Sequence, residues 1–191
     1  MTYRAIIILM QLCFISFIGK GQTFDFVKVI AGQGVVYNND TIFLEKTNIK
    51  ETCRILKIAD QTESEIIYMT MWDGFDSETG ESTSGAELTR EIKHNSLVFE
   101  FASENDKYNL ELRYIEIKEN AATKVYTDTG FELGEINPDI LGVYSEKSKH
   151  DYVSDNKLTY NLFAHGISFQ LEQLENGDKK LVEITTHRRF E

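Results

Sequence analysis

Two stretches decide the fold, LTREIKHNSLVFEF (residues 88–101) and LTYNLFAHGISFQL (residues 158–171), which align without a gap at a constant offset of 70 residues. Three positions are identical in the two stretches: Leu88/Leu158, Thr89/Thr159 and Phe99/Phe169. Apolar and polar residues alternate on both sides of a polar break, which is typical of a β-hairpin. The pair predicts one hairpin that occurs twice, with Phe99 and Phe169 in equivalent core positions.

The segments around the two stretches recur in the same order. In the first half, Asn38-Asn39-Asp40 predicts a hairpin turn, and Asn48 predicts the cap of a helix over residues 49–58, with Glu51 at capping-box spacing. Strands over residues 65–72, 86–94, 96–102 and 108–118 follow. In the second half, residues 129–144 read as a strand and a helix start capped by Asn137. Strands over residues 157–164, 167–173 and 180–186 complete it, with a turn at residues 175–178. The last strands align at an offset of 67 residues.

The expected fold is therefore α+β, built from two related units in which a short helix packs on an antiparallel β-meander. The units span residues 22–120 and 121–191, and residues 1–21 form a separate segment. That first segment has one basic residue, Arg4, a run of 14 mostly apolar residues over 5–18, and Gly19 and Gly21 before Gln22. This pattern is typical of a secretory signal peptide, and the apolar run is shorter than the about 20 residues of a membrane span. We expect a secreted or periplasmic protein with no membrane span after cleavage.

The segment FELGEINPDILG (residues 131–142) resembles the apolar Leu-Gly entry into a helix that ends at Gly in β-lactamase-inhibitor proteins and the SmpA/OmlA envelope lipoproteins. The resemblance covers little of the chain, and the first unit has Leu44-Glu45 in place of the Leu-Gly pair. No binding residue is carried over. The resemblance implies tandem protein-binding modules that work in the envelope or outside the cell.

The net charge argues against two classes of partner. Without residues 1–21 the chain has 18 basic and 31 acidic residues, a net charge of −13. Nucleic acids and anionic membrane surfaces both require a cationic protein surface, so neither is an expected partner. Cys53 is then the only cysteine, which excludes an internal disulfide and favours a buried thiol.

Candidate functional residues are few. Residues 73–87 are rich in Gly, Ser, Thr and acids, which predicts a long mobile loop whose carboxylates offer oxygen ligands for Ca²⁺, although their spacing is not that of an EF-hand. Trp72 lies where a strand enters this loop and has the character of a binding anchor, although a core position is the more ordinary role for a large aromatic. The candidate binding residues are Trp72, Asp73, Asp76 and Glu78.

No motif indicates catalysis, a metal site or a cofactor. The four histidines, His94, His150, His165 and His187, have no ligand spacing, and we expect structural or solvated roles for them. The predicted function is a non-catalytic protein-binding or envelope-associated module, with another envelope or extracellular protein as partner. A secreted hydrolase that uses acids and His165, and a Ca²⁺-dependent surface module, are the alternatives.

Overall fold

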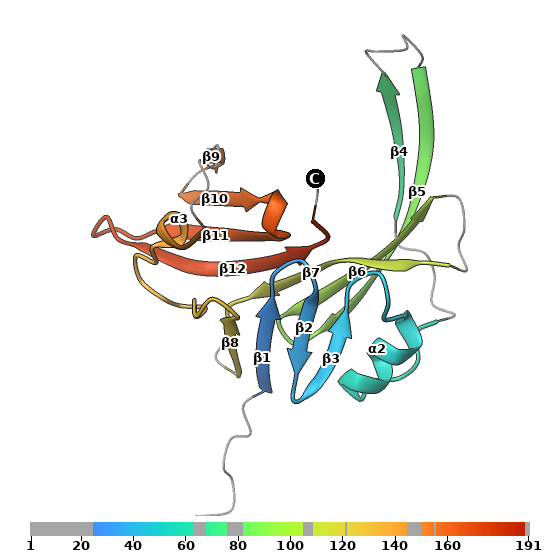
Figure 1. The fold of residues 1–191 in the computed structure, drawn as a ribbon, viewed down its shortest axis with the longest axis horizontal. Coiled ribbons are helices and arrows are strands. Elements are labelled where there is room, and N and C mark those ends of the chain that lie inside the picture. Colours follow the sequence, from blue (N-terminus) through green and yellow to red (C-terminus); the bar gives the residue numbers. More distant parts are fainter. Residues whose placement is uncertain are drawn as a thin grey trace, which may run out of the picture.

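The computed structural model describes residues 25–62, 68–75, 82–104, 109–120, 122–144, 150–154 and 156–189. The chain is mixed α+β and mostly sheet, which confirms the expected fold class. It contains a four-stranded sheet, an eight-stranded sheet and two short α-helices, among the described residues (Figure 1). We call the sheets the small sheet and the large sheet.

The small sheet has the strand order β3-β2-β1-β8. Its strands are β1 (Asp25–Ile30), β2 (Gly34–Tyr37), β3 (Asp40–Phe43) and β8 (Thr123–Thr127). The β2–β3 turn is at Asn38 and Asn39, which both have positive φ angles, as the two central residues of a type I′ turn require. β1 pairs with β8 in parallel, although Val27 and its partner Val125 are 98 residues apart in sequence. Neither β1 nor β8 was among the strands expected from the sequence.

The large sheet is antiparallel throughout. Its order is β4-β5-β6-β7-β12-β11-β10-β9, so one meander runs outward from β7 and the other from β12 (Figure 1). The strands are β4 (Tyr68–Phe75), β5 (Ser82–His94), β6 (Leu97–Glu104), β7 (Glu111–Lys118), β9 (His150–Ser154), β10 (Lys157–Leu162), β11 (Ile167–Gln173) and β12 (Lys179–His187). Residue 120 lies between β7 and β8, and strands from both sides of it form each sheet. The two halves of the chain therefore share one continuous large sheet.

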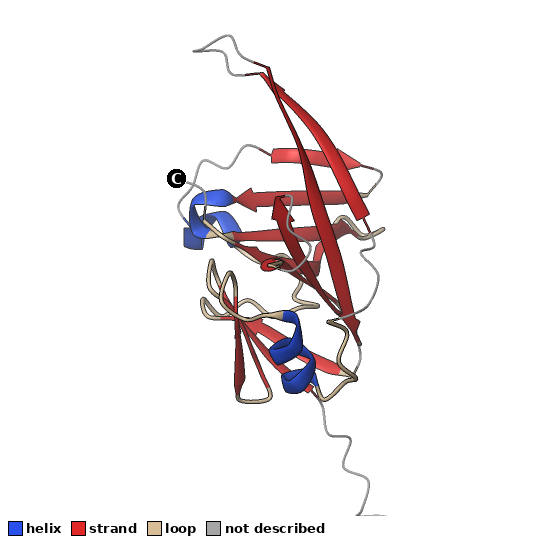
Figure 2. Ribbon diagram, turned by 90° about the vertical axis from the view of Figure 1, so that its right-hand side faces the viewer, coloured by secondary structure: helices blue, strands red, loops and turns tan. Residues whose placement is uncertain are grey.

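The core lies between the two sheets, which Figure 2 shows as two layers. It forms because alternate residues of each strand point toward the opposing sheet. Phe99, Phe101 and Phe169 of the large sheet and Val27 and Ile42 of the small sheet are completely buried. A fully buried side chain of this size contributes about 1.5–3 kcal/mol relative to leaving it in water. The predicted core positions of Phe99 and Phe169 are confirmed.

The helices are short. α2 (Ile49–Leu56) begins at Asn48, whose side chain accepts a hydrogen bond from the Glu51 amide at 2.9 Å, so the predicted cap is confirmed. The Glu51 carboxylate does not complete a capping box, because it pairs with Arg54 at 2.7 Å. The prediction that Asn137 caps α3 (Ile140–Tyr144) is wrong, because its side chain bonds Asp178 and Lys179. Asp139 accepts from the Gly142 amide instead.

Asn137 holds the β11–β12 hairpin. Its side-chain oxygen accepts from the Lys179 amide and its side-chain amide donates to Asp178, both at 2.8 Å. Its backbone amide also donates to the Lys179 carbonyl at 2.7 Å. Asn137 has a φ of 53°, a left-handed conformation that Asn tolerates better than most residues. The residue therefore acts at a hairpin turn rather than at a helix.

The prediction of a long loop over residues 73–87 is wrong. β4 continues to Phe75 and β5 begins at Ser82, with Asp73 opposite Ser84 and Phe75 opposite Ser82. Residues 76–81 lie outside the described ranges. β4 and the start of β5 form a two-stranded ribbon that extends away from the rest of the molecule (Figure 1). The prediction missed these strands because Gly, Ser, Thr and acids dominate residues 73–87, and the sequence there lacks the alternation that marks a strand.

Two glycines join the sheets. The Gly32 amide, in the β1–β2 turn, donates to the Gly166 carbonyl at 3.0 Å, and Gly166 precedes β11. A Cβ atom on Gly166 would come within 2.5 Å of the Gly32 Cα and of the His187 carbonyl oxygen. Gly166 also has a φ of 71°, which favours glycine. The close approach of the two sheets at this point therefore requires glycine.

Candidate functional site

The outer face of the large sheet, which is turned away from the small sheet, carries two adjoining hollows. The first is about 650 Å³ and the second about 230 Å³. Tyr114 and Thr185 line both of them. We call the larger one the acidic hollow and the smaller one the serine hollow.

The acidic hollow lies over β5, β6, β7 and β12. It is lined by Glu87, Glu91, Lys93, Val98, Glu100, Tyr114, Glu116, Lys118 and Thr185. The strand pairing explains this composition, because Glu91 is directly opposite Glu100 and Glu116 is directly opposite Thr185. Four carboxylates and two ammonium groups thus face the same space.

The two lysines pair with part of this charge. Lys93 contacts Glu91 at 2.7 Å, and Lys118 contacts Glu116 at 2.6 Å and Glu183 at 3.9 Å. The hydrogen bond from Lys118 to Glu116 raises the pKa of the ammonium group above its ordinary value. Carboxylates outnumber ammonium groups, so the hollow keeps a negative balance.

Burial and the crowding of carboxylates raise the pKa of two glutamates. Burial, followed by the charges of Glu91, Glu87 and Glu116, raises the pKa of Glu100 above its ordinary value. Burial and the charge of Glu116 likewise raise the pKa of Glu183, although Lys118 and Lys157 oppose the shift. Both carboxylates are therefore easier to protonate than free glutamate.

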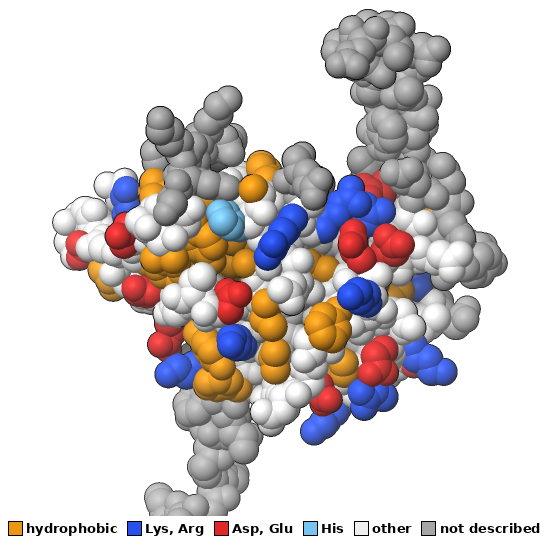
Figure 3. Space-filling view, in the orientation of Figure 1, with side chains coloured by type: hydrophobic (Ala, Val, Ile, Leu, Met, Phe, Trp, Pro, Cys, Tyr) orange, Lys and Arg blue, Asp and Glu red, His pale blue; other side chains and the backbone are white. Residues whose placement is uncertain are grey.

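The surface around α2 differs from the acidic hollow, because acidic and basic side chains are interspersed on it (Figure 3).

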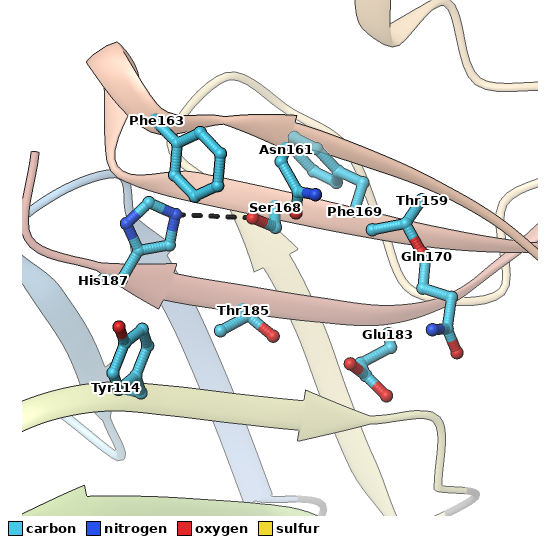
Figure 4. A pocket seen from close by; sticks show the side chains of 10 residues that line it. All are labelled: Tyr114, Thr159, Asn161, Phe163, Ser168, Phe169, Gln170, Glu183, Thr185 and His187. Carbon is cyan, nitrogen blue, oxygen red and sulfur yellow. Dashed lines mark hydrogen bonds between the residues drawn. The ribbon is translucent and has the colours of Figure 1, made fainter. Parts of the chain in front are cut away.

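The serine hollow lies over β7, β10, β11 and β12, and Figure 4 shows its lining. The lining residues are Tyr114, Thr159, Asn161, Phe163, Ser168, Phe169, Gln170, Glu183, Thr185 and His187. Ser168 of β11 is directly opposite Asn161 of β10 and Thr185 of β12, so these side chains share one face of the sheet. The floor is polar, and Phe163 and Tyr114 are half-exposed aromatic rings at its edge.

His187 is the most enclosed polar group of this hollow, with 2% of its surface exposed. Its Nε2 lies 3.3 Å from the Ser168 hydroxyl, and its Nδ1 lies 2.8 Å from the Arg188 carbonyl oxygen. The rings of Phe163 and Tyr114 lie on either side, with centroids 5.6 Å and 6.1 Å from that of the imidazole. Burial lowers the pKa of His187, although the Arg188 carbonyl opposes the shift.

The structure describes the backbone of two of the four candidate binding residues predicted from the sequence. Trp72 and Asp73 belong to β4, where they pair with Gly85 and Ser84. Asp76 and Glu78 lie outside the described residues. β4 is the neighbour of β5, and Glu87 of β5 lines the acidic hollow. The involvement of these four residues in binding stays a prediction.

The other residues singled out in the sequence have structural surroundings. Cys53 is 2% exposed in the core, as expected for a buried thiol. His94 lies 3.1 Å from the Tyr37 hydroxyl. The ring of His165 packs against Tyr144, with centroids 5.0 Å apart. His150 begins β9, and its side chain lies outside the description.

Sequence reasoning missed Ser168 and the acids of the first meander as a group. The signal that could have found them is the period of two within the predicted strands. It places Ser168 and Gln170 on one face of β11, and Glu183, Thr185 and His187 on one face of β12. The period of two does not give the order of the strands. That these two faces lie beside Glu116 and Tyr114 of β7 could therefore be seen only in the structure.

Among the described residues, no group of three or more His, Cys, Asp or Glu side chains is placed to hold a metal ion. Within the same residues, no helix is both long and apolar enough to cross a membrane. The resemblance to the β-lactamase-inhibitor and SmpA/OmlA proteins stays a prediction. A comparison of the chain with protein-family models, with curated proteins and with solved structures finds no match in any of the three.

Proposed function

We propose that this chain is an exported protein-binding module that uses the outer face of the large sheet to hold another envelope or extracellular protein. The observation that carries the proposal is the pair of adjoining hollows on a sheet face whose opposite side packs the core. A face built on paired strands is rigid, so it presents its side chains to a partner with little loss of conformational entropy.

Charge complementarity supports a partner with a cationic surface. The acidic hollow gathers Glu91, Glu100 and Glu116 on adjacent strands, and the chain as a whole is acidic. Arriving Lys or Arg side chains would relieve the repulsion that raises the pKa of Glu100. Electrostatic attraction of this kind speeds association and selects among partners more than it adds affinity.

Export is proposed from residues 1–21, whose pattern is that of a signal peptide. Cleavage before Gln22 leaves a chain whose first described strand begins at Asp25. Intact-mass measurement of the exported protein tests this, and the expected N-terminus is Gln22. A mass that includes residues 1–21 contradicts it.

We also propose that the large sheet arose by duplication of a four-stranded meander, β4–β7 and β9–β12. Two observations support this. The strand order reverses between β7 and β12, as expected for two copies related by a local two-fold axis. The ladders β6·β7 and β11·β12 each have an irregularity, between Glu100 and Phe101 in one and between Gln170 and Leu171 in the other. These two pairs of residues are 70 apart, the offset of the opening alignment.

The strand register changes the details of that alignment. The offset of 70 applies to β6 and β11, but β5 and β10 match at an offset of 68, because His94 and Leu162 occupy equivalent ends of the two hairpins. The connection after Leu162 is two residues longer than the turn after His94. For β7 and β12 the register gives an offset of 69 rather than 67, with Ile115 and Ile184 as equivalents.

With these offsets, the two copies agree on the core face and differ on the outer face. Phe99 and Phe169 keep the same buried role. On the outer face, Glu100 becomes Gln170 and Glu116 becomes Thr185, so the acids of one copy are replaced by neutral polar residues in the other. Specific function is expected where the copies differ, which is on the outer face.

The binding proposal is tested with the mature chain, residues 22–191, immobilised and exposed to envelope extract and to culture medium. The decisive variant is Glu100→Gln with Glu116→Gln, which removes two charges from the acidic hollow with little change in volume. The matched control is Glu132→Gln with Glu175→Gln, which removes two charges from exposed positions elsewhere.

We expect wild type and control to retain the same protein, and the acidic-hollow variant to retain at least tenfold less of it. Retention should also fall as salt rises, because dissolved ions screen the attraction between the charges of the two proteins. Equal retention by all three proteins, or the absence of any retained protein at low salt, contradicts the proposal.

A further inference from the structure

The serine hollow holds a hydroxyl, an imidazole and a carbonyl in a row. The Ser168 hydroxyl lies 3.3 Å from Nε2 of His187, and Nδ1 of the same ring lies 2.8 Å from the Arg188 carbonyl oxygen. A nucleophile next to a base that is oriented by a third group is the arrangement of an activated serine. Figure 4 shows the hydroxyl and the imidazole directed toward one another.

The carbonyl decides which ring nitrogen carries the proton. A carbonyl oxygen only accepts hydrogen bonds, so Nδ1 of His187 is the donor. In a neutral imidazole Nε2 is then the acceptor of the hydrogen bond with the Ser168 hydroxyl. Burial favours the neutral ring, because it lowers the pKa of His187 below its ordinary value. The base is therefore in the tautomer that can remove the serine proton.

The rest of the hollow suits a small, partly apolar substrate. Asn161, directly opposite Ser168 on β10, brings an amide donor to the far side of the hydroxyl from His187 (Figure 4). Phe163 and Tyr114 form aromatic walls beside the imidazole. The volume of about 230 Å³ is below the range of roughly 300–1,000 Å³ that suits drug-sized ligands.

The structure assigns Ser168 and His187 as a catalytic dyad for the hydrolysis of small carboxylic esters. Oγ of Ser168 bonds to the ester carbonyl carbon while Nε2 of His187 takes the hydroxyl proton. The bond from carbon to the alcohol oxygen breaks, and the alcohol leaves with the proton from Nε2. Water then attacks the acyl-serine, again through Nε2, and releases the carboxylic acid and the free Ser168 hydroxyl.

The remaining groups have supporting roles in this reaction. The Asn161 amide donates to the carbonyl oxygen as it becomes negative, and the Arg188 carbonyl keeps the imidazole in position. The activity goes beyond the proposed binding function and does not depend on it. It uses neither the acids nor His165, the residues on which the sequence-based alternative of a hydrolase relied.

Two probes test the assignment on the mature chain. An alkyl fluorophosphonate forms a bond from phosphorus to Oγ with loss of fluoride, and peptide mapping by mass spectrometry locates the adduct. Turnover of 4-nitrophenyl acetate is followed by absorbance. The variants are Ser168→Ala, His187→Gln and Asn161→Ala, and Ser103→Ala in β6 is the control. Urea unfolding of each variant checks that it is folded.

We expect the adduct on Ser168 in wild type and in Ser103→Ala. Ser168→Ala removes the nucleophile, so it should abolish the adduct and lower ester turnover at least as much as loss of the general base, which contributes about 10²–10⁴-fold. His187→Gln should do the same, and Asn161→Ala should lower turnover about tenfold or more while Ser168 still reacts. If His187→Gln does not fold, Ser168→Ala decides.

Three results overturn the assignment. They are the absence of an adduct on Ser168, ester turnover that Ser168→Ala leaves unchanged, and an adduct on Ser168 without turnover above the rate in buffer. The retention experiment on the acidic hollow is independent of all three, so a failure of one proposal is distinguishable from a failure of the other.

Discussion

Glu91 of β5 and Glu100 of β6 lie directly opposite each other on the outer face of the large sheet. Like charges in this relationship destabilise a strand pair. Burial and the neighbouring carboxylates, Glu91 first among them, raise the pKa of Glu100. The fold therefore holds a carboxylate at a position where its ionisation is unfavourable.

Glu100→Gln should stabilise the protein at pH 7, by up to about 1 kcal/mol, the range of a cross-strand pair. A folded-state pKa above the unfolded value means that the native state binds more protons, so stability falls as pH rises through the folded pKa. The gain should therefore be absent below the ordinary glutamate pKa of 4.5 and should grow above it. Urea unfolding at pH 4 and pH 7 measures it. Glu175→Gln, in an exposed turn, should change neither value, and an equal gain at both pH values contradicts the account.

His187 should titrate below the ordinary histidine value of 6.5, because burial opposes its charge. In ¹⁵N NMR spectra Nδ1 should be protonated and Nε2 unprotonated at neutral pH, as the Arg188 carbonyl requires. The native state then binds fewer protons than the unfolded state. This contribution to stability is fully present above pH 6.5 and is lost as pH falls through the folded pKa. A protonated Nε2 at pH 7 contradicts the tautomer.

Gly166→Ala should destabilise the protein strongly. The new Cβ would meet the backbone of Gly32 and His187, and the positive φ adds a conformational cost. Crowding of about 1–3 kcal/mol and a left-handed cost of about 1–2 kcal/mol predict a loss of roughly 2–5 kcal/mol. Gly177→Ala is the matched control, because Gly177 also has a positive φ but has no atom within 4 Å of the new Cβ. Urea unfolding should show only the conformational cost for the control, and equal losses contradict the argument.

Substitutions at Asn137 should separate its side-chain bonds from its backbone conformation. Asn137→Gly keeps the positive φ and removes the hydrogen bonds to Asp178 and Lys179, which predicts a loss of about 1 kcal/mol. Asn137→Ala removes the same bonds and adds a left-handed cost of about 1 kcal/mol. In thermal unfolding the midpoint temperature should therefore be highest for wild type, lower for Asn137→Gly and lowest for Asn137→Ala. If the two variants are equally stable, the left-handed conformation at residue 137 is not maintained.

The sequence predicted those strands and helices whose signal, alternation or a cap, lies within the element itself. The part of β5 from residue 86 onward, β6, β7 and β10–β12 alternate strongly, and α2 has both an apolar face and the cap Asn48, so these were expected. β1, β8 and β9 were missed, and each is a short strand; the partners in the parallel pair of β1 with β8 are 98 residues apart. Asn137 was misassigned because Asn favours both helix caps and left-handed turns, and only its contact with Lys179 distinguishes them.

The candidate site was predictable only in part for the same reason. Alternation along β12 puts Thr185 and His187 on one face, but their neighbours depend on the strand order. The contact of His187 with Ser168 depends on the register of β12 against β11, and the long connection after Leu162 sets the register that puts Asn161 opposite Ser168. A constant-offset alignment of the two hairpins hides that extra length.

The parallel pairing of β1 with β8 has a consequence for the order of folding. During synthesis the β1 segment emerges first, but β8, its partner, follows about 100 residues later, and Thr186, which bonds the Ile30 carbonyl, is 156 residues away. Closing such distant contacts is slow, and β-rich chains of high contact order fold in milliseconds to seconds. Until then β1 has one open edge, so the interval before the C-terminal half arrives is when the chain is most exposed to aggregation.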